Sequence, residues 1–109
     1  MTTKIVTTTI RPNSETPWYY ETPAAATDEE FNNLSLLMSE QVNLGNITVD
    51  LSYPDDFTFV LTLTLINEAE YLAANNVSTV EELLNTSPAS VIAYNTDKGI
   101  TESSIVETV

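Results

Sequence analysis

The chain has 109 residues, of which sixteen are acidic and only three are basic, so its formal net charge is −13. It contains no histidine and no cysteine, which excludes Ser–His and Cys–His catalysis, thiolate metal sites and disulfide frameworks. A large negative charge repels phosphate backbones and anionic lipid, so we expect no nucleic-acid partner and no membrane partner.

The length predicts a single domain spanning residues 1–109, large enough to bury one two-layer core. We expect no metal site and no cofactor. The acidic pair Asp55-Asp56 lies in a predicted turn, where turn geometry alone favours aspartate. Two glycines cannot build a glycine-rich phosphate loop. The composition therefore argues against an enzyme without excluding one.

The N-terminal segment, residues 3–11, is rich in β-branched side chains and predicts a strand that Pro12 ends. Residues 12–26 hold three of the five prolines and the aromatic trio Trp18, Tyr19 and Tyr20. Aromatic side chains need packing partners, so we expect an ordered loop rather than a flexible linker.

A helix is predicted over residues 28–42. Thr27 and Glu30 have the spacing of a capping box, with Thr27 as the N-cap. Apolar residues then recur at helical spacing, and Gly45 supplies a stop.

The strongest pattern is a β-hairpin over residues 46–66, in which apolar and polar residues alternate on both sides of a Pro-Asp-Asp turn. One face is apolar and needs a helical layer. The other face is threonine-rich, too neutral for an ordinary solvent face and too polar for a monomer core.

After the hairpin, a second helical region is expected to be broken in two at residues 75–78. Residues 91–94 then predict a strand, and residues 96–109 a C-terminal extended tail, of which 100–109 are alternatively a weak terminal strand. This order predicts an α+β, ferredoxin-like split βαβ fold: a four-stranded antiparallel sheet with helices on one face.

The threonine-rich face suggests pairing with a second copy of the chain. The first functional hypothesis is therefore a non-enzymatic structural or interaction protein that assembles as a homodimer, with a further protein partner also open. The predicted interface comprises Thr48, Asp50, Thr58, Val60, Thr62 and Thr64.

The aromatic trio, with Arg11 nearby, is the candidate ligand-binding site. Trp18, Tyr19 and Tyr20 either line a pocket or close one end of the core, and Arg11 is the cation that could orient an anionic group there. This supports a second hypothesis: a small apolar-ligand-binding protein, or a cofactor-independent oxygenase, with its cavity near Trp18. A third hypothesis is an acidic inhibitor of a basic host protein.

Two resemblances add context. The predicted order of elements over residues 3–95 resembles the dimeric ferredoxin-like proteins typified by antibiotic biosynthesis monooxygenases, which implies a small cavity between sheet and helices; of the residue types that family uses, Trp18 and Arg11 are present here. The ends, 1–13 and 94–109, resemble small uncharacterised proteins of T4-like phages of marine cyanobacteria. That resemblance implies a viral protein in the host cytoplasm or the virion.

Overall fold

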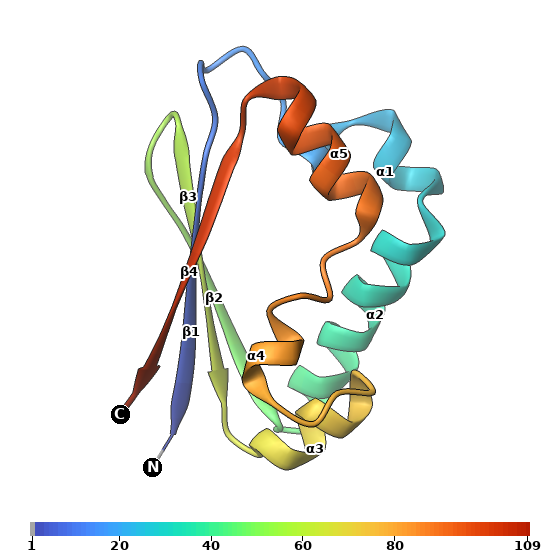
Figure 1. Cartoon of the computed structure of the whole chain (residues 1–109), viewed down its shortest axis with the longest axis vertical. Coiled ribbons are helices and arrows are strands. Elements are labelled where there is room, and N and C mark those ends of the chain that lie inside the picture. The colour runs from blue at the N-terminus through green and yellow to red at the C-terminus, as the bar shows by residue number, and fades with distance from the viewer. Residues whose placement is uncertain (1) are drawn as a thin grey trace.

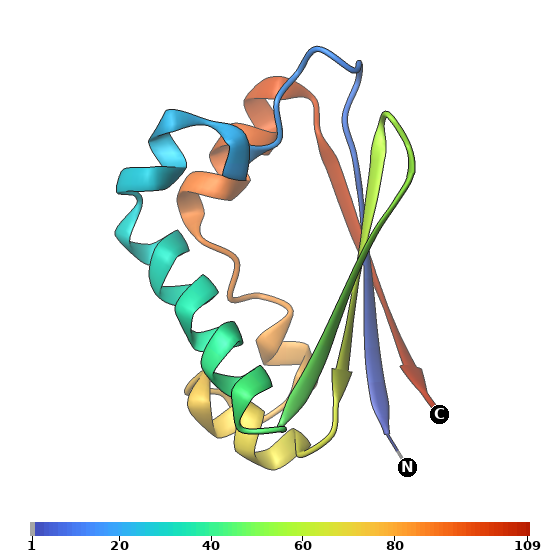
Figure 2. The same ribbon diagram turned by 180° about the vertical axis from the view of Figure 1, so that it is seen from behind.

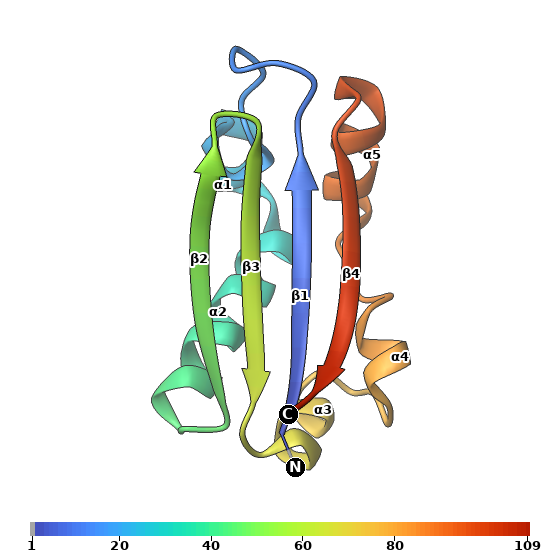
Figure 3. The ribbon, with the colours of Figure 1, turned by 90° about the vertical axis from the view of Figure 1, so that its left-hand side faces the viewer.

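Four antiparallel strands form one sheet in the computed structural model, which describes residues 2–109 (Figure 1). The strands are β1 (Thr3–Ile10), β2 (Ile47–Asp55), β3 (Thr58–Leu65) and β4 (Thr101–Thr108). Their order across the sheet is β2-β3-β1-β4, so the hairpin occupies one side and the C-terminal strand forms the opposite edge, as Figure 3 shows face-on. The predicted α+β class and the four-stranded antiparallel sheet are confirmed.

Two views from opposite directions show that the helices all lie on one side of this sheet (Figures 1 and 2). They are the 3-10 helix η1 (Tyr19–Glu21), α1 (Pro23–Thr27), α2 (Glu29–Asn43), α3 (Glu68–Ala74), α4 (Val80–Leu83) and α5 (Ala89–Lys98). No helix within residues 2–109 covers the other face of the sheet (Figure 3). The predicted break between the helical segments α3 and α4 is confirmed.

Helix α2 begins one residue later than the capping pattern indicated. Its N-cap is Asp28, whose Oδ1 accepts the backbone N–H of Phe31 at 3.1 Å. The expectation that Thr27 caps this helix is wrong, because Thr27 is the last residue of α1 and its hydroxyl donates to the carbonyl of Ala24. Pro23 starts α1, a position that suits proline because its missing N–H would have no partner there.

The predicted hairpin is confirmed, but its turn lies at residues 56–57 and not at Pro54-Asp55-Asp56. Pro54 and Asp55 belong to β2, which has an irregularity between Ser52 and Asp55. Leu63 lies opposite both Ile5 of β1 and Val49 of β2, so apolar residues of three strands share the face toward the helices. This face carries the buried core at the end of the sheet near α3 and α4. The core cluster is Ile5, Ile47, Leu63, Leu65, Tyr71, Leu72 and Leu83.

The predicted strand at residues 91–94 is wrong, since these residues lie inside helix α5. The β-branched pair at 91–92 favoured a strand, but Pro88 precedes the segment at the N-cap and Gly99 ends it with a φ of 72°. Both are helix boundaries. Residues 96–98 therefore form the end of helix α5 and do not belong to an extended tail. The alternative prediction, a terminal strand over residues 100–109, is confirmed by β4, which pairs with β1 along its whole length.

The described part of the chain contains no helix that is both long and apolar enough to cross a membrane.

Candidate functional site: a cavity between sheet and helices

A cavity of about 290 Å³, partly open to solvent, lies between the sheet and the helical layer, adjoining the core. Its sheet wall includes Thr7, Thr9, Phe59, Leu61, Glu102 and Ser104. Its helical wall includes Phe31, Leu34 and Met38 of α2 and Val91 and Asn95 of α5. On this wall β1 and β4 contribute threonine, serine and glutamate side chains beside the apolar ones of β3.

Aromatic side chains close one end of this cavity. The ring of Trp18 meets Phe59 of β3 edge-on, with ring centroids 4.7 Å apart, and only 5% of Trp18 is exposed. Tyr19 packs in the same manner against Phe31 of α2 at 5.2 Å and against Tyr94 of α5 at 5.4 Å. Edge-on contacts at these distances are favourable beyond the area that they bury. The aromatic loop, which carries Trp18 and Tyr19, therefore connects the sheet to helices α2 and α5.

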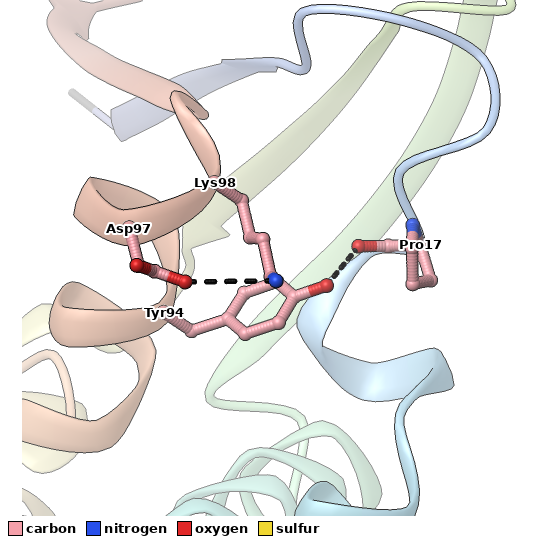
Figure 4. Close-up of polar contacts among 4 residues, drawn as sticks. All are labelled: Pro17, Tyr94, Asp97 and Lys98. Carbon is pink, nitrogen blue, oxygen red and sulfur yellow. Dashed lines mark hydrogen bonds and ion pairs between the residues drawn. The ribbon is translucent and has the colours of Figure 1, made fainter.

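Helix α5 is held to the same loop by a hydrogen bond from its own aromatic side chain (Figure 4). The hydroxyl of Tyr94 donates to the carbonyl of Pro17 at 2.6 Å. One turn later, the Lys98 ammonium lies 3.5 Å from the carboxylate of Asp97 and 5.9 Å from the centre of the Tyr94 ring. The Lys98 contacts lie within α5, whereas the Tyr94 hydrogen bond attaches this helix to the loop at the cavity.

A second connection runs through Asp28, which accepts hydrogen bonds from the hydroxyls of Tyr19, at 2.5 Å, and Ser90. These bonds favour the ionised carboxylate, with Ser90 the larger cause, and lower the pKa of Asp28. The same carboxylate raises the pKa of Tyr19, because it holds the phenol proton and opposes a second negative charge. Loop, α2 and α5 thus meet at a single carboxylate.

The polar part of the cavity wall lies on β1 and β4. The hydroxyls of Thr7 and Ser104 bond each other at 2.8 Å. Thr9 is only 3% exposed, and its Oγ1 has no hydrogen-bond partner within residues 2–109. Glu102 lies directly opposite Thr9 and is exposed to solvent, and partial desolvation by the cavity wall raises the pKa of its carboxyl. A carboxyl and an unpartnered hydroxyl thus meet on one wall of an apolar space.

The predicted ligand-binding residues line two neighbouring hollows. Trp18, Tyr19 and Tyr20 line the cavity. Arg11 lines a separate hollow, which Trp18 and Tyr20 also border. There its guanidinium donates to the carbonyls of Asp56 and Thr16, both at 2.8 Å, and lies over the Trp18 ring at 4.7 Å. Arg11 therefore braces the aromatic loop, and its use for an anionic ligand stays a prediction.

Sequence reasoning did not find Thr7, Thr9, Glu102 or Ser104. Alternation along β1 places Thr7 and Thr9 on the same face as the buried Ile5, which was a usable signal. For Glu102 no such signal existed, because its face depends on the register of β4 against β1.

The predicted dimer residues share the face turned away from the helices. Thr48, Asp50, Thr58, Val60, Thr62 and Thr64 alternate with the residues that form the core and cavity wall. Val6 lies between Thr62 and Ile105 on neighbouring strands, so two further apolar side chains extend this face. We call this set, with Val6 and Ile105, the open face.

Among the residues described, no three acidic side chains gather in a way that could hold a metal ion. No protein family, curated protein or solved structure matches the chain significantly. We therefore infer the function from the structure of the chain alone.

Proposed function

We propose that this protein binds a small, largely apolar molecule in the cavity between its sheet and its helices. The observation that carries the proposal is the cavity itself, about 290 Å³ in volume and walled by aliphatic and aromatic side chains with a few polar groups. Small-molecule sites have this composition and begin at about this volume.

Two further surface hollows of the molecule are at least as large, so volume alone does not single out this space. Its position does, because it lies between the two layers of the fold and adjoins the core, where protein interiors contain few voids larger than one water molecule. The aromatic loop and α5 are nevertheless held over the space by directed hydrogen bonds from Tyr94 and Tyr19. A ligand that fills the space would restore the missing contacts.

The topology supports the same reading. The strand order β2-β3-β1-β4, with helices crossing between β1 and β2 and between β3 and β4, is that of a ferredoxin-like split βαβ arrangement. We assign the chain to this arrangement. Such a layer of helices on one sheet face leaves the sheet–helix interface as the place where a ligand is enclosed.

Binding rather than turnover is the function proposed. The cavity-lining residues include no imidazole, thiol or lysine amine. The lining hydroxyl that contacts a carboxylate is that of Tyr19, and its bond to Asp28 holds the loop to α2 and α5. A cofactor-independent oxygenase would use the same cavity, and it would be recognised by consumption of oxygen and of the bound aromatic compound.

The test is a calorimetric titration with 1-naphthalenemethanol, a neutral apolar probe, on two variants of neighbouring residues. Leu61→Trp fills the cavity, whereas Val60→Trp adds the same side chain on the opposite face of the same strand. We expect saturable binding to the native protein and to Val60→Trp, and loss of binding in Leu61→Trp. Absence of saturable binding to the native protein, or unchanged binding to Leu61→Trp, would contradict the proposal.

A second candidate function, assembly of a homodimer through the open face, rests on a separate observation. Val6 lies opposite Ile105, and Val60 lies diagonally from Val6 on the neighbouring strand, so three apolar side chains share this face with neutral threonines. Lys4 lies directly opposite Glu107 on the same face. A face of this kind can meet its own copy if the contact leaves Asp50 of each protomer at the edge. The viral structural role suggested by the ends of the chain belongs to this candidate.

Sedimentation velocity measures this second candidate directly. We expect a dimer for the native protein and a monomer for Val60→Glu, because a buried unpaired carboxylate opposes association. Leu36→Glu on the outer face of α2, where the leucine is 68% exposed, should leave the dimer intact. A monomeric native protein at micromolar concentration excludes this candidate.

A further inference from the structure

The cavity contains one ionisable carboxyl and no cation. Of the residues that line it, Glu102 is the single acidic one, and none is lysine or arginine. The cations of the chain are engaged elsewhere. Arg11 donates to two loop carbonyls, Lys98 pairs with Asp97, and Lys4 lies on the open face opposite Glu107. The Glu102 carboxylate lines this apolar space, is exposed to solvent and has no cationic partner among the residues described, so a ligand that supplies a positive charge there would gain an ion pair.

Thr9 provides an independent indication beside it. The two residues are register partners on β1 and β4, so their side chains leave the sheet on the same face. Thr9 is almost completely buried and lines the cavity, yet its Oγ1 has no partner among the residues described. Leaving a buried hydroxyl unbonded costs free energy, and a ligand N–H group next to Glu102 would remove that cost.

The remaining walls suit the body of such a ligand. Rings of Trp18, Tyr19 and Phe59 surround the same space, and aromatic faces attract organic cations as well as apolar groups. The net charge of −13 adds a long-range field that draws cations toward the protein and repels anions.

From these observations we infer that the ligand is a hydrophobic amine, whose ammonium group binds between the Glu102 carboxylate and the Thr9 hydroxyl while its apolar body fills the aromatic cavity. The inference rests on the proposed small-molecule function and names the chemical class of that ligand. The bond is a charge-assisted hydrogen bond in a partly dry site, which is stronger than its counterpart in water.

The experiment compares three probes with one ring system and different charges: 1-naphthylmethylamine, 1-naphthalenemethanol and 1-naphthoate, each titrated calorimetrically into the full chain. We expect the amine to bind about tenfold more tightly than the alcohol, as one charge-assisted hydrogen bond predicts. The carboxylate should bind most weakly. In Glu102→Gln, amine and alcohol should bind with equal affinity.

The matched control is Glu107→Gln, which removes the same charge from the same strand but on the open face. The Glu107→Gln protein should still bind the amine more tightly than the alcohol. A loss of this preference in Glu102→Gln alone would then come from the local contact and not from the overall negative charge. If the alcohol binds as well as the amine, or if both variants lose the preference equally, the amine inference is wrong while the binding function stands. If none of the three probes binds, the binding function and the inference both fail.

Discussion

Thr9 and Glu102 lie directly opposite each other on antiparallel strands β1 and β4, and both line the cavity between sheet and helices. Neither has a polar side-chain partner within residues 2–109. Thr9 is buried whereas Glu102 is exposed to solvent. Buried polar groups in folded proteins are nearly always bonded, so the unbonded Thr9 hydroxyl marks a position where stability has been given up. Loss of stability at a cavity wall is typical of binding sites.

Replacing Thr9 with valine should stabilise the unliganded protein. The two side chains have the same shape, and the change removes a buried hydroxyl whose unmade hydrogen bond costs about 1 kcal/mol or more. The free energy of unfolding in urea measures the effect. Thr7→Val is the control: its hydroxyl bonds Ser104, so that variant should be no more stable than the native protein. A destabilised Thr9→Val would show that the hydroxyl has a partner in solution.

Glu102→Gln should raise the thermal midpoint at neutral pH. Partial desolvation raises the pKa of Glu102 from its ordinary value of 4.5, so the folded state holds this proton more tightly than the unfolded state does. The resulting stability is present below 4.5 and is lost as the pH rises through the folded pKa. The advantage of the variant should therefore disappear in acid, as thermal unfolding at several pH values would measure. Glu107→Gln, on the open face, should lack this pH dependence.

Asp28→Asn should destabilise the protein at neutral pH while retaining the helix cap. Asparagine can still accept the Phe31 N–H, but it loses the charged acceptor of Ser90 and Tyr19. Because the pKa of Asp28 is lowered from 3.8, its contribution is present above that value and is lost as the pH falls through the folded pKa. Thermal midpoints of native and variant proteins should converge in acid. Asp97→Asn, an exposed site with the same charge change, should have little effect at either pH.

Leu65→Ala should cost about 2–5 kcal/mol of unfolding free energy, because Leu65 is one of the two most completely buried side chains and its loss leaves a void in the core. Leu36→Ala removes the same atoms from an exposed position on α2 and should change stability by no more than about 0.5 kcal/mol. Chemical denaturation compares the two. Equal effects would mean that the core cluster does not hold the sheet and helices together.

The sequence by itself predicted the elements whose patterns are local. The hairpin follows from strict alternation over residues 46–66, and the broken helical region from the residues that separate α3 and α4. The aromatic loop was expected to be ordered and to lie at the cavity, and Trp18, Tyr19 and Tyr20 do line it. Helix α5 was missed because its β-branched pair outweighed the boundary signals of Pro88 and Gly99.

Only the tertiary structure decided the polar wall of the site. Glu102 lies about ninety residues along the chain from Thr9, and the register that joins them is fixed by long-range pairing of β4 with β1. The contacts of Arg11 with the carbonyls of Asp56 and Thr16 likewise depend on the fold, and its use for an anionic ligand stays a prediction. Composition determined that the protein has no histidine or cysteine and is strongly acidic. Contacts between distant segments decide which polar groups remain without a partner, and no local sequence pattern specifies those contacts.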